Sequence, residues 1–373
     1  MTQLRRQDPL SELEREELGD RVRKMTRRGM VGGLAGISAL AGTLGVGYRT
    51  TAAEAFKSVG LVPEDLPAKQ YKAITVEVLA ASTWVSHGME TAKFFGDLLG
   101  VEVSSFDGQG QPELQLQALL DAANQDFDFI ALHPSSSDAL IDGADAIIES
   151  GKPFIIMDTR LIQDPAANAE YPYLTYIEPD NLYMGSTVAN ELFKAIGGEG
   201  QVIHTQGALG HTGAQGRAEG FNLTAANYPG IEVVDETPAN WLPDEAFTLW
   251  QDLLQRYPDV KGGYFHSDDM ALGARAAVES AGMQDQVKIV GVDGLRNACE
   301  AILQDRLTAT VINPSGRIHG GAIWAGYYQV SGTDNYTGFD GNTEIPKFIR
   351  ADGGPIVKEN ALGYLWLHDN FQY

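Results

Sequence analysis

The sequence has little cysteine and little positive charge. Cys299 is its single cysteine, which excludes an internal disulfide and a thiolate metal cage. It follows an Arg-Asn-Ala run on a predicted helix, where we expect a buried small apolar residue. The chain has 27 Lys and Arg against 50 Asp and Glu, a formal net charge of −23. This balance argues against nucleic acid and anionic membrane surfaces as partners, because both need a basic footprint.

A strongly apolar run long enough for a stable membrane span is also missing near the N-terminus. The stretch VGGLAGISALAGTLGV follows the basic RVRKMTRRGM, but it is short and diluted by glycine. TAAEA then offers small residues at Ala53 and Ala55 for cleavage. With the pair Arg27-Arg28, residues 1–55 resemble a twin-arginine export signal, followed by a linker at 56–70. The alternative is an uncleaved amphipathic anchor. The export signal predicts a periplasmic protein that folds before export, which the lack of cysteine pairs permits.

The rest of the chain alternates between strand and helix patterns. Apolar stretches such as KAITVEVLAAS, FDFIALHP and PFIIMDT are typical of buried strands, and each is followed by a helical pattern. A longer connection rich in Pro and Asn interrupts this order at 160–181, after which it resumes. We therefore predict an α/β protein of two doubly wound parallel-sheet lobes. The N-terminal lobe is expected at 71–179 plus 314–349, and the C-terminal lobe at 180–313 plus 350–373.

Polar and aromatic side chains follow the predicted strands. Ligands of doubly wound sheets bind outside the carboxyl ends of the strands, so two facing lobes would share one cleft. Carboxylates and amides can each hold neighbouring hydroxyls, and an indole face packs on a sugar ring. The set therefore predicts a polyhydroxylated ligand. The predicted contacts are Trp84, Ser86, His87, Asp158, Arg160, Gln215, Trp241, Ser267, Asp293 and Asn313.

Several of these positions also have a purely structural interpretation. Trp84 and Trp241 can be core aromatics, and for them the two interpretations are evenly balanced. Asp268 is favoured as the cap of the helix that follows it, which leaves Ser267 as the better ligand contact. Arg217, four residues before Phe221, is interpreted as a structural tie, and Gln215 as the contact.

Several stretches, taken in order, resemble the periplasmic sugar-binding proteins of ABC importers, the ribose-binding-like group that shares its fold with LacI-type repressors. The likeness spans about residues 71–358. It rests on FDFIALHPSSSDAL, IDGADAIIESGKPFIIMDT, IEPDNLYMG, GRAEGF, SDDMALGARAAVESAGM, KIVGVDG and LTATVINP. Each stretch is weak alone, but their order and spacing make the match specific.

The resemblance implies ligand contacts at particular positions of this chain. They are Ser86, Asp158, Gln215, Trp241, Ser267, Asp293 and Asn313. The chain departs from the family where an aromatic pair often follows the first strand: Gly88 and Met89 stand there, so that Trp84 or His87 would substitute. Gln215 and Ser267 replace a usual Arg and Asn, and an Arg comes one place late, as Arg160. These departures imply a neutral sugar or polyol other than plain ribose.

Other function classes find less support in the sequence. QGALGHTGAQG does not have the glycine spacing of a nucleotide-cofactor enzyme, and no G-x-S-x-G motif is present. The seven histidines are scattered without metal-ligand spacing, so we predict no metal, no cofactor and no enzymatic activity. A transcription regulator of the same fold would need a helix-turn-helix head, but the first 55 residues hold a glycine-rich apolar segment instead. A periplasmic sensor that presents its ligand to a chemoreceptor or sensor kinase stays open beside transport.

The resemblance also implies a mechanism. Two lobes joined by three strands, a periplasmic-binding-protein-like fold of type I, close on the ligand about hinges near Ile177–Asn181, Asn313–Ser315 and Phe348–Asp352. The closed form, a monomer, would deliver its ligand to a membrane permease without changing it chemically.

Overall fold

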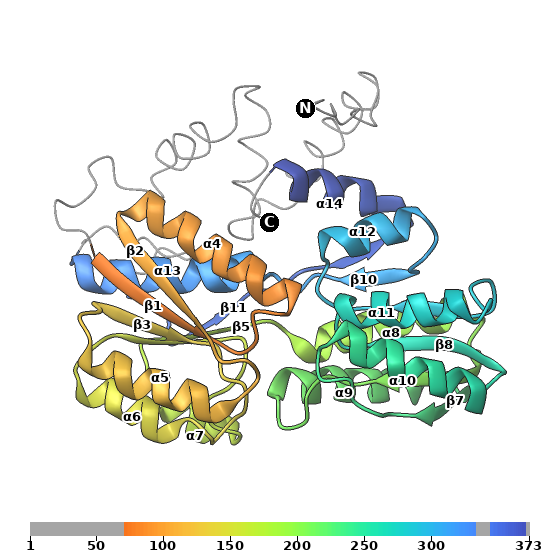
Figure 1. Ribbon diagram of the computed structural model, residues 1–373, viewed down its shortest axis with the longest axis horizontal. Coiled ribbons are helices and arrows are strands. Elements are labelled where there is room, and N and C mark those ends of the chain that lie inside the picture. Colours follow the sequence, from red (N-terminus) through yellow and green to blue (C-terminus); the bar gives the residue numbers. More distant parts are fainter. Residues whose placement is uncertain (1–70, 333–343, 371–373) are drawn as a thin grey trace. The chain divides into compact units, whose positions relative to one another are not determined.

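The computed structural model describes residues 71–332 and 344–370, which form two α/β lobes (Figure 1). The predicted export signal, the linker at 56–70 and the last residues of the predicted C-terminal lobe lie outside this part of the chain. In the residues that the structure describes, no helix has both the length and the apolar character to cross a membrane.

The first lobe is built on a six-stranded sheet in the order β11-β5-β4-β3-β1-β2, with every pairing parallel. Helix α13 packs against α4 and against strands β3 to β5. The strands are β1 (Tyr71–Glu77), β2 (Val101–Asp107), β3 (Phe129–Leu132), β4 (Phe154–Met157), β5 (Thr175–Glu178) and β11 (Phe348–Arg350). The helices are α4 (Thr83–Leu99), α5 (Pro112–Asn124), α6 (Ile141–Glu149), α7 (Pro165–Glu170) and α13 (Ser315–Ser331).

The second lobe repeats this plan in a sheet ordered β12-β10-β9-β8-β6-β7. Its edge strand β12 pairs antiparallel with β10, while the other pairings are parallel. The strands are β6 (Glu199–Thr205), β7 (Gly230–Asp235), β8 (Val260–Phe265), β9 (Lys288–Val290), β10 (Ala309–Val311) and β12 (Pro355–Val357). The helices are α8 (Asn181–Ala195), α9 (Thr212–Ala225), α10 (Pro243–Arg256), α11 (Asp268–Ser280), α12 (Arg296–Leu303) and α14 (Lys358–Asn370).

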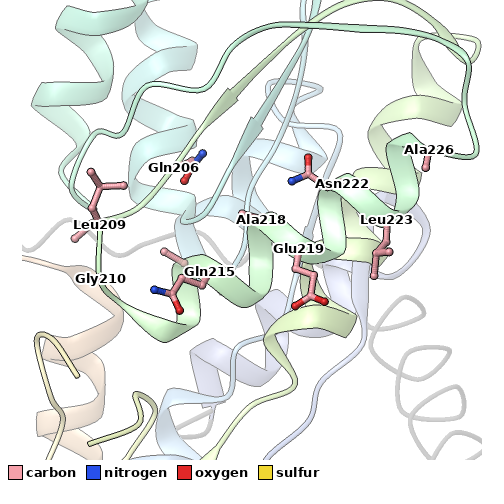
Figure 2. A pocket seen from close by; sticks show the side chains of 11 residues that line it. Gln206, Leu209, Gly210, Gln215, Ala218, Glu219, Asn222, Leu223 and Ala226 are labelled. Carbon is pink, nitrogen blue, oxygen red and sulfur yellow. The ribbon is translucent and has the colours of Figure 1, made fainter. Parts of the chain in front are cut away.

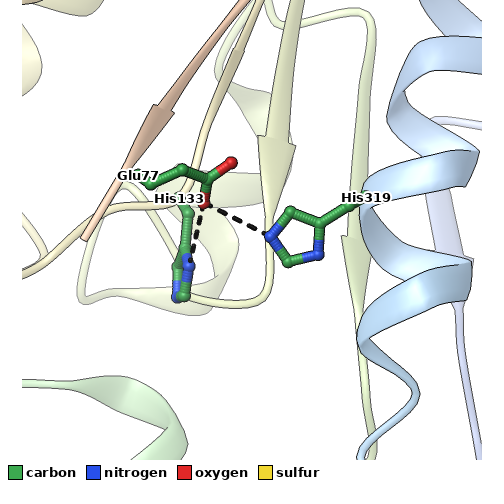
Figure 3. Close-up of side chains that lie close together, drawn as sticks. All are labelled: Glu77, His133 and His319. Atoms are coloured by element: carbon green, nitrogen blue, oxygen red, sulfur yellow. Dashed lines mark hydrogen bonds and ion pairs between the residues drawn. The ribbon is translucent and has the colours of Figure 1, made fainter. Parts of the chain in front are cut away.

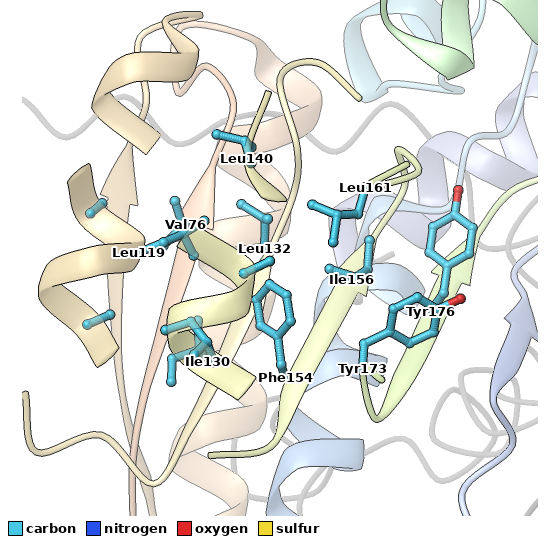
Figure 4. Packing of buried hydrophobic residues seen from close by; sticks show 14 residues of the cluster. Val76, Leu119, Ile130, Leu132, Leu140, Phe154, Ile156, Leu161, Tyr173 and Tyr176 are labelled. Carbon is cyan, nitrogen blue, oxygen red and sulfur yellow. The ribbon is translucent and has the colours of Figure 1, made fainter. Parts of the chain in front are cut away.

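Each lobe has its own apolar core. Strands β3 and β4 read FIAL and FIIM and are buried at every position, as expected for central parallel strands covered on both faces. Their side chains join α5 and α6 in a cluster that includes Leu119, Ile130 and Phe154 (Figure 4). A second cluster, with Leu192, Phe221 and others, lies in the second lobe. These two cores hold the strand ends in place.

The chain passes between the two sheets three times, at 179–180, 312–314 and 351–354. The crossings are tied to one another: Ala351 donates its N–H to the Glu178 carbonyl at 2.9 Å, and Ile312 donates to Gly354 at 3.1 Å. Cys299, as expected, is buried in α12.

Two local predictions differ from the structure. The strand predicted at KAITVEVLAAS ends at Glu77, and α4 begins at Thr83 because a turn at 80–82 starts the helix early. The connection predicted at 160–181 contains the short helix α7, which Asp164 caps by accepting from the Ala167 N–H, and strand β5. The Pro and Asn residues of this connection concealed α7 and β5.

Candidate functional site

Charged and polar side chains from both lobes meet beyond the ends of the strands. The first lobe contributes groups from the ends of β1, β3 and β4, together with one side chain of α13. The second lobe contributes groups from α9 and from the segments that follow β6, β7, β9 and β10. They are Glu77, His133, Asp158 and His319 from the first lobe, and His211, Arg217, Trp241, Asp293 and Asn313 from the second.

A carboxylate and two imidazoles form the innermost part of this group. Oε2 of Glu77 lies 3.6 Å from Nδ1 of His133 and 3.3 Å from Nε2 of His319 (Figure 3). All three side chains are buried. Burial alone would raise the pKa of Glu77, but His319 and His133 lower that pKa below its ordinary value. The two imidazoles therefore favour the ionised form of Glu77, although all three side chains are buried away from water.

Asp158 continues the cluster toward the second lobe. Its Oδ2 lies 3.5 Å from Nε2 of His133. The hydroxyl of Thr159, the next residue after Asp158, lies 2.7 Å from Nε2 of His211. Burial by itself would lower the pKa of His133, but the carboxylates of Asp158 and Glu77 raise that pKa to about 9. Burial instead lowers the pKa of His211 to about 3. The two carboxylates therefore favour positive charge at His133, whereas burial disfavours it at His211.

The second lobe places a buried guanidinium at the same site. Arg217 is 3 % exposed; its Nη1 donates to the His266 carbonyl and lies 3.7 Å from Oδ1 of Asp293. Its Nη2 donates at 2.8 Å to the amide oxygen of Asn313, in the amide orientation that satisfies both groups. The guanidinium also lies 5.5 Å from the centre of the Trp241 ring. Burial raises the pKa of Asp293 well above its usual range, and Arg217 only partly offsets this.

Two indoles flank the group. Trp84, 5 % exposed, donates from Nε1 to the Asn313 carbonyl at 2.8 Å and lies edge-on to His133 and His319. Trp241 packs edge-on against His211 with ring centres 5.1 Å apart. It is half-buried and has a φ of +69°, a left-handed conformation that is strained for an aromatic residue. Both predicted tryptophans therefore lie where the lobes meet.

The structure changes the assignment at Ser267 and Asp268. Ser267 caps α11, since its hydroxyl accepts from the Met270 N–H at 3.2 Å. Asp268, predicted as the cap, instead accepts from the Leu295 N–H at 2.8 Å, which ties α11 to the segment after β9. Its neighbour Asp269 accepts from both the N–H and the hydroxyl of Thr83, each at 2.8 Å, and so crosses between the lobes.

Four predicted contacts lie away from the buried group. Gln215 is exposed and accepts from Gln163 at 2.7 Å. Ser86 donates to the Thr83 carbonyl within its own helix, and the His87 ring lies 6.5 Å from the His368 ring. Arg160 contributes its backbone N–H, which donates to the hydroxyl of Thr212 at 3.1 Å. Gln215 and Arg217 are two residues apart, about 200° around the helix, so α9 exposes Gln215 and buries Arg217.

A groove of about 570 Å³ runs beside α9, with Gln206, Leu209, Gln215 and Leu223 among its lining residues (Figure 2). Of the ten predicted contacts, it includes Gln215 alone. The polar groups that meet between the lobes are therefore separate from this groove.

Sequence reasoning missed Glu77 and His319 and described the histidines as scattered. Along the chain they are, but the fold brings His133, His211 and His319 together. A signal for Glu77 existed, since it is a carboxylate at the end of a largely apolar strand. His319 lies in the first turns of the largely buried helix α13 and carries no comparable signal.

The fold and the convergence of polar groups at strand ends define a two-lobed α/β binding protein. Residues 73–334 match the model of the periplasmic binding protein domain, and the chain belongs to that family. It is 28% identical over 248 residues to the D-allose-binding periplasmic protein of Escherichia coli, covering 65% of this chain and 79% of that protein.

A second relative agrees with this assignment, and a solved structure shares the fold. The xylitol-binding protein of Mycolicibacterium smegmatis is 28% identical over 233 residues, which cover 62% of this chain and 64% of that protein. A periplasmic solute-binding protein of Actinobacillus succinogenes with bound D-allose superposes with a TM-score of 0.72 at 24% identity, covering 79% of this chain and all of that one.

These comparisons confirm the predicted resemblance, the fold class and the function class, a substrate-binding protein of an ABC importer. The family consists of periplasmic solute carriers that are not enzymes and that work with an ABC permease.

Proposed function

We propose that this chain captures a neutral sugar or polyol between its lobes and delivers it to a membrane permease. The observation that carries the proposal is the meeting of buried hydrogen-bonding groups from both lobes, with Asp158, Arg217 and Asn313 at its centre and an indole on either side. Family membership and the relatives that bind D-allose and xylitol support this ligand class.

The chemistry of these groups suits hydroxyls. Asp158 keeps Oδ1 without a hydrogen-bond partner among the described residues, and the Ser135 hydroxyl, which follows β3, is in the same state. A buried acceptor without a donor costs about 1–3 kcal/mol, so a ligand hydroxyl that donates to it is favoured. Arg217 offers several donors to ring or hydroxyl oxygens, and Trp241 offers an apolar face.

The contacts between the lobes must open for a ligand to enter. Asp269 to Thr83 and His211 to Thr159 both join the two lobes. We infer that the lobes rotate about the crossings at 179–180, 312–314 and 351–354, and that the ligand replaces or completes such contacts. It stabilises the closed form by its differential affinity for that form.

A thermal-shift screen of the full chain against pentoses, hexoses, polyols, nucleosides and amino acids tests the ligand class. A specific ligand at a thousandfold excess over Kd stabilises the folded state by about 4 kcal/mol. We expect a shift with one sugar or polyol. A shift with nucleosides or amino acids only would contradict the proposal.

We also propose export by the twin-arginine route and a monomeric carrier. The support is the Arg27-Arg28 pair and the lack of cysteine pairs. Replacing both arginines by lysine should leave the protein in the cytoplasm, and secretion of that variant would refute the route.

Light scattering of the purified protein measures its mass in solution and so checks that it is a monomer. Pull-down of the ligand-loaded form on a chemoreceptor or sensor-kinase domain separates sensing from transport.

A further inference from the structure

Three buried side chains from separate elements of the first lobe aim at one point. Glu77 ends β1, His133 follows β3, and His319 lies in the first turns of α13. Figure 3 shows both imidazoles directed at the same carboxylate oxygen. One ligand atom of each side chain lies within 4.8 Å of the other two. We call these three residues the Glu77 cluster.

The hydrogen bonds of His319 imply that a positive charge lies between its ring and the Glu77 carboxylate. Its Nδ1 lies 2.9 Å from the Ser315 carbonyl oxygen, which can only accept, so Nδ1 carries a proton. In a neutral ring Nε2 then has a lone pair, and it faces the lone pairs of Glu77 Oε2 at 3.3 Å. Two acceptors at that distance repel each other in a buried site. Either a second proton or a cation must lie between them.

The distances favour a cation. Charge-assisted N–H···O bonds are about 2.7–2.9 Å long. The separations from Glu77 Oε2 are 3.3 Å to His319 and 3.6 Å to His133, which is too long for such bonds. Ligand atoms at about 2.0–2.1 Å from a tetrahedral zinc ion are separated by about 3.3–3.4 Å. We propose that the Glu77 cluster binds a divalent transition-metal ion of the zinc class, with the fourth position open.

The surroundings complete such a site. The second nitrogen of His133 faces Asp158 Oδ2 at 3.5 Å, and that of His319 donates to the Ser315 carbonyl. Carboxylates and carbonyls in these places orient metal-bound histidines. Glu77 and Asp158 together balance the charge of a divalent ion. Trp84 lies 5.5 Å and 5.2 Å, centre to centre, from the two imidazoles and shields them from water.

A neighbouring trio, His133, Asp158 and His211, is a poorer candidate. Gly213 donates its N–H to Nδ1 of His211 at 3.1 Å, so the proton of that ring is on Nε2. Nε2 uses it at 2.7 Å from the Thr159 hydroxyl. His211 therefore has no lone pair to offer toward Asp158, whereas His319 has one toward Glu77.

Metal binding to the full chain tests the proposal independently of the sugar ligand. The protein is stripped with a chelator and titrated with Zn²⁺ by calorimetry and with Co²⁺ by visible absorption, which reports a tetrahedral N/O site. We expect one ion per chain. Glu77→Gln and His319→Gln should weaken binding by more than the 10–100-fold typical of losing an outer partner. His204→Gln, which removes a buried histidine outside the cluster, should bind as wild type.

The wild-type protein alone can overturn the proposal. If folded, stripped protein takes up neither ion, a proton holds the cluster together. Equal uptake by wild type and His319→Gln places any bound metal elsewhere and also refutes the site. Should the variants fail to fold, the stoichiometry and the Co²⁺ spectrum of wild type still decide.

Discussion

The two lobes position their polar groups at the shared site by different means. In the first lobe Glu77, His133 and Asp158 lie at the ends of central strands, and each carboxylate faces an imidazole. In the second lobe Trp241 and Asp293 have φ angles of +69° and +130° and lie in connecting segments. Both lobes hold a buried carboxylate beside a basic side chain, but the first gathers two carboxylates around one imidazole, whereas the second adds an aromatic residue on a left-handed backbone.

The two lobes should therefore respond differently to substitution. A buried charge pair that loses one partner leaves the other uncompensated, so damage in the first lobe should appear as lost stability. In the second lobe burial raises the pKa of Asp293, which can therefore stay neutral without Arg217, so damage there should appear mainly as lost ligand binding. The following changes test that contrast.

Glu77→Ala should have the largest effect. It leaves His133 and His319 buried without their shared carboxylate, and breaking a buried pair costs about 3–5 kcal/mol. Urea unfolding of the full chain measures the loss. Asp126→Ala is the matched control, because Asp126 pairs with Lys72 on the surface of the same lobe, and we expect no measurable change. Equal effects of the two substitutions would contradict a stabilising cluster.

Arg217→Met should mainly affect ligand binding. The side chain joins Asp293 and Asn313 beside Trp241, and in the proposed site its guanidinium donates to the ligand; losing a hydrogen bond to a charged group costs about 1.5–3 kcal/mol. This corresponds to a rise in Kd of about 10-fold or more. Gln215→Ala, on the exposed side of α9, should keep the wild-type Kd. The opposite result would restore the contact predicted from the sequence.

These two substitutions mark how far the sequence could be interpreted. The alternation of strand and helix predicted two lobes, since each buried strand such as FIIM has a clear apolar signal. Strand ends also indicated Asp158, Asp293 and Asn313. Helical phase was harder, because choosing Gln215 over Arg217 depends on which side of α9 packs against the lobe. His319 could not be found, because only packing brings α13 beside β1.

Asp268→Asn should alter the pH dependence of stability. Burial raises the pKa of Asp268 to about 8, and the nearby carboxyls of Asp269 and Asp293 belong to the same acidic group. An Asp with a raised pKa contributes stability below its unfolded value, near 4, and loses it as pH rises through about 8. Its slope is at most about 1.4 kcal/mol per pH unit. Unfolding measured from pH 5 to 8 should be flatter in the variant. An unchanged slope would show that Asp268 is ionised throughout.

Asp269→Asn should have the smallest effect, and it tests a contact between the two lobes. Ser82, the N-cap residue of α4, makes no side-chain cap bond, and Asp269 of the other lobe accepts from the Thr83 N–H instead. Asn can keep the cap hydrogen bond but lacks the carboxylate charge, which is worth about 0.3–1 kcal/mol at a helix N-terminus. Because this contact exists only when the lobes touch, losing the charge should raise the Kd for ligand up to about fivefold.

A cap within one lobe provides the contrast. Asp164 caps α7 of the first lobe from inside, so Asp164→Asn should lower stability in urea slightly and leave the ligand Kd unchanged. Asp269→Asn should do the reverse. The contact between Asp269 and Thr83 is absent from the open, ligand-free form, so its loss should not change the free energy of unfolding of that form. Scattering radii of both variants with and without ligand show whether closure is altered. If Asp269→Asn bound ligand as tightly as wild type, the contact with Thr83 would not contribute to closure.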